Sequence, residues 1–316
     1  MARLPLSLTT LVLLCLGGAL LAQPAVELGL SGNDNAFEQT VLLGDQPLLV
    51  YRFGADLPKP SVSSLRTLAG HEMLLYSPAD HAHHRGLMFA LGNVAFADAA
   101  ADEPYLIFWG EEGEPNHLGH IATTELEANV EDNGVVLQST NEWRRNSDDA
   151  LVLTELRRIT VHPPTKEGYL LTWESDLTAG ARDLMFGGTP GAAVSYYGLG
   201  LRVAPDMDRG LITDANGKSG PADVNGDNAT WCAYISPVEP ARGFAMFDHP
   251  QNPRHPTGWF AMNDGFGYIT ASLVAHEPYP LKAGETVKLR YGLFVFDGQP
   301  SAETIAAQFT AWSKLP

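Results

Sequence analysis

Cysteine is nearly absent from this sequence, because Cys15 and Cys232 are the only two in 316 residues. A disulfide framework and a thiolate metal cluster are therefore excluded if Cys15 leaves with an N-terminal leader. Cys232 lies in the apolar stretch 230–234, TWCAY, which favours a buried strand over a reactive thiol. We expect the core alone to stabilise the fold, which suits a chain that is 45% hydrophobic.

Lysine and arginine are also scarce, since 20 of them stand against 37 Asp and Glu and give a net charge of −17. An acidic surface repels phosphate backbones, so we expect no nucleic-acid partner. The charge gives no reason to expect adhesion to anionic membranes. It suits a neutral or cationic ligand.

Long apolar runs are missing after the N-terminus. Residues 1–22 have the layout of a secretory signal, with Arg3 in a short basic region, an apolar stretch from Leu6 to Leu14, and Ala22 before the cut. The sequence predicts a secreted or periplasmic protein with no membrane association after signal cleavage. It leaves the oligomeric state open.

Helical periodicity is rare, and short strand-like runs dominate. The runs 135–143, 151–161 and 169–175 are rich in β-branched and aromatic residues and are separated by turn residues, which predicts an antiparallel meander. Similar runs follow at 243–247, 267–274 and 286–296. Glu155 and Arg157 share one parity with the apolar residues of their run, which predicts a half-polar sheet face rather than a fully buried strand.

Only the C-terminus has a clear helical pattern, because Ser301 can cap a helix that places Ile305, Phe309 and Trp312 on one face. Gly (31) and Pro (22) suit many short elements joined by turns, and no repeat or linker divides the chain. We predict an all-β protein, with one antiparallel β-sandwich domain over residues 23–316 and a short C-terminal helix.

Several common enzyme motifs are absent as well: a phosphate-binding P-loop, a dinucleotide fingerprint, a G-x-S-x-G elbow and an H-E-x-x-H pair. What the chain does contain is two clusters of titratable side chains.

The first cluster is DHAHHRG at 80–86, where Asp80, His81, His83, His84 and Arg85 fall within six positions. Apolar runs flank them, and burying such groups is costly unless they are paired or bind something. In extended geometry His81, His83 and Arg85 would point one way and Asp80 and His84 the other. The histidines could hold a divalent metal, or one could act as general acid or base while Arg85 orients an anionic or hydroxyl-rich substrate. A polar turn whose imidazoles cap backbone groups is the structural alternative.

The second cluster is FDHPQNPRHPTGWF at 247–260, which holds Asp248, His249, Asn252, Arg254 and Trp259. Its three prolines predict a rigid loop, and rigid loops on sheets often carry sites. A flat indole beside amide, guanidinium and imidazole groups suits a sugar ring. A structural loop with a packed Trp is the alternative.

Weaker candidates lie elsewhere. His117 and His120 fall in a loop with proline and glycine. The stretch 222–228, ADVNGDN, lacks the closing carboxylate of a calcium loop, so a turn is favoured. Arg202 and Glu142 could reach a concave sheet face or form surface ion pairs.

Five segments follow one another along the chain: DHAHHRGLMFALGNV, GLGLRVA, GLITDANGK, FDHPQNPRHPTGWF and VKLRYGLFVFDG. These segments and their order make the chain similar to the PmoA-like family of exported bacterial proteins. The resemblance covers nearly all of the chain after the signal. It implies a fold similar to the β-supersandwich of galactose-mutarotase-like proteins. In that fold, His and carboxylate side chains on a concave sheet handle a sugar.

We therefore interpret the chain as an exported carbohydrate-active enzyme, an epimerase, lyase or hydrolase that uses acid–base chemistry. The predicted reacting centre consists of His81, His83, Asp248 and His249. The predicted substrate contacts are Asp80, His84, Arg85, Arg202, Asn252, Arg254 and Trp259. Both clusters should then line one cleft. No cofactor is expected, and a divalent metal is the alternative. A non-catalytic sugar-binding or metal-binding protein is the runner-up function.

Overall fold

The computed structural model describes residues 28–33, 37–54, 56–100, 102–189 and 191–316. The predicted signal and Cys15 lie outside these residues. Within the described ranges, no helix is long and apolar enough to cross a membrane.

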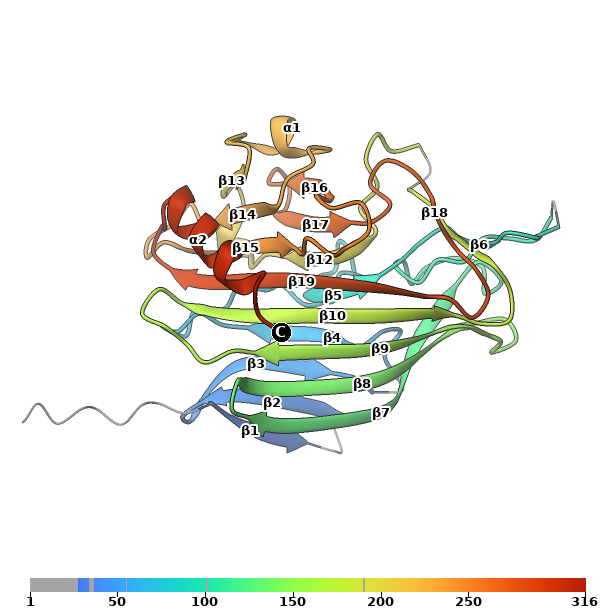
Figure 1. Ribbon diagram of the computed structural model, residues 1–316, viewed down its shortest axis with the longest axis horizontal. Coiled ribbons are helices and arrows are strands. Elements are labelled where there is room, and N and C mark those ends of the chain that lie inside the picture. Colours follow the sequence, from blue (N-terminus) through green and yellow to red (C-terminus); the bar gives the residue numbers. More distant parts are fainter. Residues whose placement is uncertain (1–27, 34–36, 55, 101, 190) are drawn as a thin grey trace, which may run out of the picture.

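Two large antiparallel sheets lie one in front of the other (Figure 1). In the described residues, the first sheet has eight strands in the order β1 (Leu28–Asn33), β2 (Glu38–Leu43), β3 (Gln46–Arg52), β4 (Ser61–Leu65), β5 (Leu87–Ala90), β12 (Gly198–Arg202), β17 (Tyr268–Ser272) and β16 (Gly258–Met262).

The second sheet also has eight described strands, in the order β13 (Leu211–Asp214), β14 (Trp231–Ile235), β15 (Arg242–Asp248), β19 (Thr286–Asp297), β10 (Tyr169–Ala179), β9 (Leu151–Val161), β8 (Gly134–Arg145) and β7 (Gly119–Glu131). A small third sheet joins β18 (Tyr279–Leu281), β11 (Leu184–Phe186) and β6 (Val94–Phe96). The predicted meander is confirmed, because β8, β9 and β10 are antiparallel neighbours.

The main core lies between the two large sheets. Along β10, Leu171, Trp173 and Leu177 are fully buried, while the alternating residues Glu174 and Asp176 are partly exposed. This period of two is what a strand with one core face requires. The inward side chains of β10 share one apolar cluster with those of β3 in the other sheet.

The prediction that Glu155 and Arg157 belong to a half-polar sheet face and not to a buried centre is wrong. Both side chains lie in the interior, 0% and 1% exposed, and their guanidinium and carboxylate groups are 2.9 Å apart. Glu155 also accepts hydrogen bonds from the Trp143 indole and the Ser175 hydroxyl, and Arg157 donates to the Pro60 carbonyl. The pair can be buried because these neighbours saturate it.

The predicted C-terminal helix is confirmed as α2 (Ala302–Trp312), and Ser301 caps it by accepting a hydrogen bond from the Thr304 amide. Ile305 and Trp312 bury one face of the helix in a second apolar cluster with residues of β15 and β19 (Figure 1). A short helix, α1 (Pro221–Val224), and a 3-10 turn at Pro205–Met207 complete the described elements.

Cys232 is a free, fully buried residue of β14, and burial raises its pKa well above the usual value.

The two antiparallel sheets and the C-terminal helix together form the fold that the sequence predicts, an all-β antiparallel sandwich with a short C-terminal helix.

Candidate functional site

An aromatic pocket of about 390 Å³ lies against the first sheet. Its lining consists of His81, His83, His84, Trp109, Tyr196, Phe260, Met262, Phe266 and Tyr268. The β16–β17 hairpin supplies four of these side chains. They lie on one face of the hairpin, whereas Ile269 and Ala271 lie on the opposite face and join the main core. We call this cavity the aromatic pocket.

The three pocket histidines come from the loop that joins β4 to β5. This loop is a tight turn rather than an extended segment, because the His84 amide donates to the His81 carbonyl and the Ser77 amide donates to the His84 carbonyl. The turn stacks the His81 and His84 rings, with centroids 4.8 Å apart and planes 14° apart. The His83 ring meets them edge-on. The expected separation of His81 and His84 onto opposite sides is therefore wrong.

Asp80 and Arg202 fix the hydrogen-bonding roles of two of these rings. Asp80 Oδ2 lies 2.9 Å from His81 Nδ1 and 3.0 Å from Arg202 Nη2. The bond from His81, with Arg202 adding to it, lowers the pKa of the Asp80 carboxyl to about 2. An ionised carboxylate only accepts, so His81 Nδ1 donates, and the neutral form of the ring has its lone pair on Nε2.

His84 has the opposite arrangement. Arg202 Nη1 lies 3.4 Å from His84 Nδ1, and a guanidinium only donates. Nδ1 of His84 therefore accepts, and its Nε2 carries the proton. The Arg202 guanidinium is held in place because it stacks on the Phe266 ring, 3.8 Å from the centroid.

Burial keeps the inner imidazoles neutral. Burial, followed by the charge of Lys59, lowers the pKa of His83 to about 4. Burial, followed by the neighbouring His83, lowers the pKa of His84 to about 3. Neutral pH therefore leaves both rings uncharged in the pocket.

Arg85 does not line the pocket, although the sequence suggested a substrate contact. Its guanidinium forms a bidentate pair with Glu111 and lies over the Tyr76 ring. Glu111 also accepts a 2.8 Å bond from the fully buried Lys59, which donates at 2.7 Å to the Trp109 carbonyl. This Arg85–Glu111–Lys59 clamp ties the histidine loop to the loop that carries Trp109.

The second predicted cluster uses its polar groups on one another and on nearby backbone. Asp248 is 1% exposed and accepts hydrogen bonds from the Asn252 amide, the His255 ring and the Thr257 backbone. The other side of the Asn252 amide meets the backbone of Arg290. Asp248 therefore shapes the loop, and Asn252 holds the loop against β19 at the edge of a cavity on the second sheet.

The remaining predicted contacts of this loop are structural too. Arg254, at a φ of 65°, donates to the backbone carbonyls of Leu273, Glu277 and Pro278. Trp259 is 0% exposed, with its indole N–H on the Ala229 carbonyl. Its side chain points into the core, so it presents no face to a sugar.

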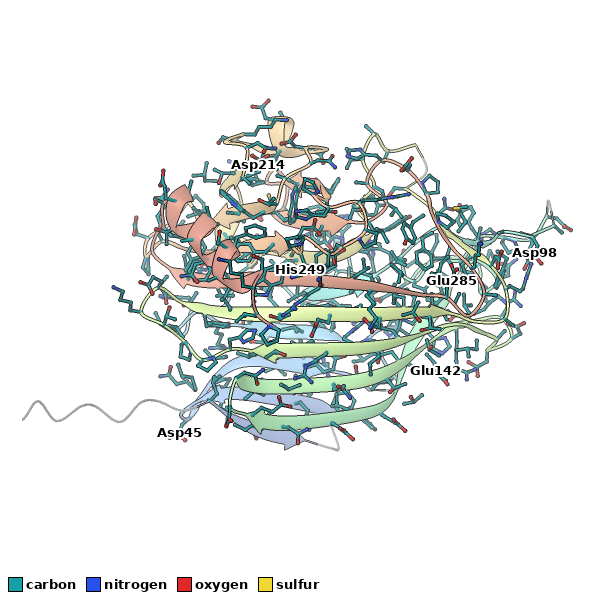
Figure 2. All side chains as sticks on the ribbon, viewed as in Figure 1. Asp45, Asp98, Glu142, Asp214, His249 and Glu285 are labelled. Atoms are coloured by element: carbon teal, nitrogen blue, oxygen red, sulfur yellow. The ribbon has the colours of Figure 1, made fainter. Side chains whose placement is uncertain are left out.

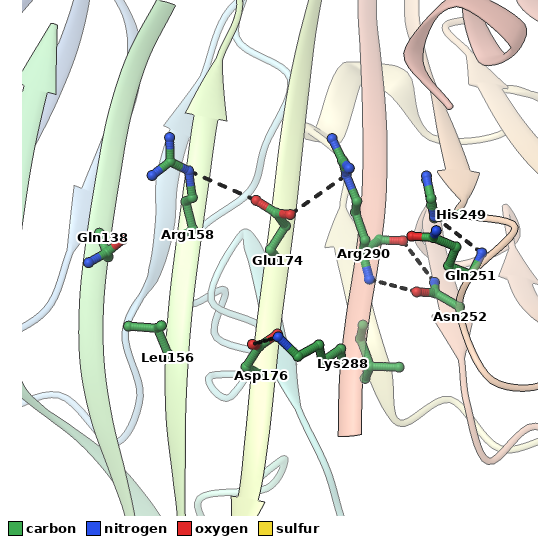
Figure 3. A pocket seen from close by; sticks show the side chains of 11 residues that line it. Gln138, Leu156, Arg158, Glu174, Asp176, His249, Gln251, Asn252, Lys288 and Arg290 are labelled. Carbon is green, nitrogen blue, oxygen red and sulfur yellow. Dashed lines mark hydrogen bonds and ion pairs between the residues drawn. The ribbon is translucent and has the colours of Figure 1, made fainter. Parts of the chain in front are cut away.

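His249 lies beside α2, where its ring packs edge-on against Trp312 (Figure 2). It borders a different cavity, of about 350 Å³, on the second sheet (Figure 3). The expectation that His83 and His249 share one cleft is therefore wrong. Each borders a separate pocket on a separate sheet.

The cavity beside His249 is a charged sheet face whose cations and carboxylates pair across the strands. Glu174 lies between Arg158 and Arg290, at 4.0 and 3.7 Å, and Lys288 pairs with Asp176 at 2.8 Å (Figure 3). These residues share two register rows across β9, β10 and β19. Cross-strand pairing of opposite charges explains them without a ligand.

The weaker candidates are also accounted for by local contacts. His120 bonds Asn146, the half-buried His117 ring packs edge-on against Tyr105, and Glu142 pairs with Arg144. Within the ranges that the structure describes, no three His, Cys, Asp or Glu side chains come together as a metal site.

Most of the pocket's aromatic lining was missed from the sequence. Trp109, Tyr196 and Phe266 lie in three separate loops, and Tyr268 lies in a strand where an aromatic residue is ordinary. A signal exists only for Phe266, which stands in a glycine-rich turn, GFG, where a large apolar side chain is unusual.

Comparison with known proteins gives a family but no activity. The group described as "Family of unknown function (DUF6807)" matches residues 38–310. No curated protein matches the chain. Crystal structures of heparan sulfate lyase HepC from Pedobacter heparinus, mutant and unmutated, are similar at 10% identity with TM-scores of 0.34 and 0.36. The matches cover 88% and 87% of this chain but only 36% and 35% of the two lyase chains. The chain thus spans about a third of their length, and the likeness carries no argument.

Proposed function

Because the chain belongs to the DUF6807 family, whose description assigns no chemistry, we propose from the aromatic pocket that it is a carbohydrate-active enzyme. The observation that carries the proposal is the pair of stacked imidazoles with opposite tautomers. His81 Nε2 has a lone pair because Asp80 accepts from Nδ1, and His84 Nε2 has a proton because Arg202 donates to Nδ1.

The walls of the pocket suit a sugar ring. Aromatic side chains offer flat apolar surface to the C–H faces of a pyranose, and imidazoles offer donors and acceptors to its hydroxyls. A volume of about 390 Å³ falls in the range of small-molecule sites.

The chemistry we propose is proton transfer at a sugar carbon or hydroxyl. His81 Nε2 takes a proton from one position, and the Asp80 carboxylate stabilises the imidazolium that forms. His84 Nε2–H remains a hydrogen-bond donor to the sugar oxygen on which negative charge develops, because a neutral imidazole is too weak an acid to give up this proton. At a hemiacetal carbon, His81 takes the hydroxyl proton as the ring C–O bond breaks and returns it to the ring oxygen. Closure of the ring on the other face of the carbonyl then inverts that carbon, which is the work of an epimerase.

Hydrolysis fits less well. Most glycoside hydrolases use two carboxylates that flank the scissile bond. In the part of the chain that the structure describes, the residues that line this pocket include no carboxylate. We therefore place epimerisation ahead of hydrolysis among the reactions that the sequence suggested.

Export and freedom from metal are part of the same proposal. They rest on the signal-like residues 1–22, on the resemblance to the PmoA-like and galactose-mutarotase-like proteins, and on the proton chemistry above, which needs no cation. Mass spectrometry of secreted material should find a mature chain that begins near Gln23, and chelator should not change turnover.

The decisive experiment incubates the purified protein with a panel of neutral and acidic sugars and short oligosaccharides and follows configuration and chain length by NMR. His81→Gln should lower the rate of the active substrate by roughly 10²–10⁴-fold while its affinity stays within a few fold. His117→Gln, which changes a half-buried histidine outside the aromatic pocket, is the matched control and should keep the wild-type rate.

Each other result would decide between the alternatives. An unchanged rate in His81→Gln would remove His81 from the chemistry. Binding of a sugar without any turnover would favour the non-catalytic sugar-binding protein. Loss of turnover with chelator would restore the metal hypothesis.

A further inference from the structure

Two buried polar groups without partners belong to side chains that line the aromatic pocket, and a third lies beside one of them. Ten side-chain nitrogen or oxygen atoms of the described residues are buried with no hydrogen-bond partner. Five of the ten are Nε atoms of arginines. The other five belong to Ser61, Trp109, Asp214, Tyr268 and Thr270. Trp109 and Tyr268 line the pocket, and Thr270 stands two residues from Tyr268 on the same face of β17.

Such groups are rare, because folded proteins pair more than about nine in ten of their buried polar groups. The side chains of Trp109, Tyr268 and Thr270 are 3%, 1% and 0% exposed, so solvent at the protein surface does not serve them. Unpaired groups beside one cavity indicate that a ligand bound in the cavity supplies their missing hydrogen-bond partners.

The Tyr268 hydroxyl has a space made for it. It lies over Gly200 of β12, where a Cβ would collide with it and would also press on the Thr270 hydroxyl. The Thr270 hydroxyl is near enough to lower the Tyr268 pKa in part, against the larger rise caused by burial. No aligned hydrogen bond joins the two hydroxyls, and a bond between them would still leave one proton without an acceptor.

The charges around the pocket are already paired. Arg202 is bonded to Asp80, and Glu111 takes both Arg85 and Lys59. Among the described residues that border the pocket, a carboxylate or sulfate would therefore meet no unpaired cation, and burying an unpaired charge is costly. Trp109 Nε1 can only donate, so the group that reaches it must be an acceptor.

From these contacts we infer that the ligand is an uncharged, hydroxyl-rich ring, a neutral sugar rather than a sugar acid or sulfated sugar, whose oxygens bond Trp109 Nε1 and the Tyr268 hydroxyl. This inference rests on the proposed function for the location of the site. It makes Trp109 and Tyr268 binding residues and gives Gly200 the role of leaving room for the Tyr268 hydroxyl.

The experiment uses Tyr268→Phe, which removes only the hydroxyl, with Tyr234→Phe as the matched control. Tyr234 is equally buried, but its hydroxyl is paired: it donates to the Met207 carbonyl and accepts from the Gly210 amide. Without ligand, Tyr268→Phe should keep or raise the melting temperature, whereas Tyr234→Phe should lower it.

The binding arm titrates neutral aldoses and their matching uronates into each variant, followed by tryptophan fluorescence and calorimetry. The best neutral sugar should bind the wild type at least about tenfold more tightly than its uronate. Tyr268→Phe should lower the affinity for that neutral sugar by roughly 3- to 10-fold, and Tyr234→Phe should leave this affinity unchanged.

Three outcomes would overturn the inference. The first is a melting temperature that falls in Tyr268→Phe as far as in Tyr234→Phe, which would show the hydroxyl to be paired in the free protein. The second is equal or tighter binding of the uronate, and the third is unchanged neutral-sugar affinity in Tyr268→Phe. None of these depends on turnover, so the inference can fail while the proposed catalysis stands, and a catalytically silent protein can still confirm it.

Discussion

Two loops of this protein have nearly the same polar composition and opposite uses for it. The loop 76–86 leaves His81 and His84 with a free acceptor and a free donor at the aromatic pocket. The loop 247–260 uses Asp248 to accept from its own Thr257 amide and Arg254 to donate to the backbone carbonyls of a neighbouring segment. The difference lies in the backbone that each loop must satisfy. Three prolines hold the second loop in a shape that regular strand pairing does not cover, so side chains bond the backbone groups that remain.

The largest effect that tests this comparison is expected from Asp248→Ala. It removes a buried acceptor of three hydrogen bonds and should lower the free energy of unfolding by about 3–5 kcal/mol. Urea unfolding measures this change. The fraction that remains folded should still bind and turn over substrate at the aromatic pocket. Lost turnover with wild-type stability would instead place loop 247–260 in the active site.

Asp80→Asn is the converse experiment. The carboxylate is half exposed, so its loss should change the free energy of unfolding by no more than about 1 kcal/mol. The amide no longer fixes the His81 tautomer, and turnover should fall by roughly 10²-fold or more. Asp206→Asn is the matched control, because Asp206 is also an exposed partner of a buried arginine, Arg242. Equal turnover in the two variants would contradict the role of Asp80.

Acid should reveal the buried histidines. The folded-state pKa values of His83 and His84, about 4 and 3, lie below the ordinary value of 6.5. Between these values the unfolded chain binds more protons, so this contribution to stability is complete above pH 6.5 and is lost as the pH falls toward 4 and 3.

His84→Gln should therefore flatten the dependence of unfolding free energy on pH between about 6.5 and 4, by up to about 1.4 kcal/mol per pH unit. Urea titrations at several pH values measure the slope. Tyr234→Phe, which weakens the fold without touching a histidine, should keep the wild-type slope. A wild-type slope in His84→Gln would mean that the ring is charged in the folded protein.

The smallest effect is expected from His249→Gln. His249 lies on the other sheet, so kcat/KM at the aromatic pocket should stay within about twofold of the wild type. Steady-state kinetics on the substrate found in the panel give the answer. A loss approaching that of His81→Gln would revive the single cleft that the sequence suggested.

The fold was predictable because it rests on short-range alternation. The period of two along 135–175, the turn residues between the runs and the cap at Ser301 all act within a few residues, and each one predicted its element correctly. The interior position of Glu155 and Arg157 was not predictable in this way. Their burial depends on Trp143, Ser175 and other partners from neighbouring strands, which no local pattern contains.

The candidate site was predictable only where the sequence concentrates it. The histidine loop stood out because several imidazoles fall side by side, and it does line a pocket. Trp109 and Tyr196 are single aromatic residues in distant loops, and only the tertiary fold brings them to the histidines. Composition misled at 247–260, where the same residue types satisfy a proline-rich backbone instead of a ligand.

The Arg85–Glu111–Lys59 clamp has a consequence for the thermodynamics of binding. It connects the histidine loop and the Trp109 loop through charge-assisted bonds, with Lys59 fully enclosed. The two walls of the pocket are therefore fixed relative to each other when the chain folds, before any ligand arrives. A ligand then loses its own freedom of motion on binding but does not have to order the protein, so more of each contact remains as affinity.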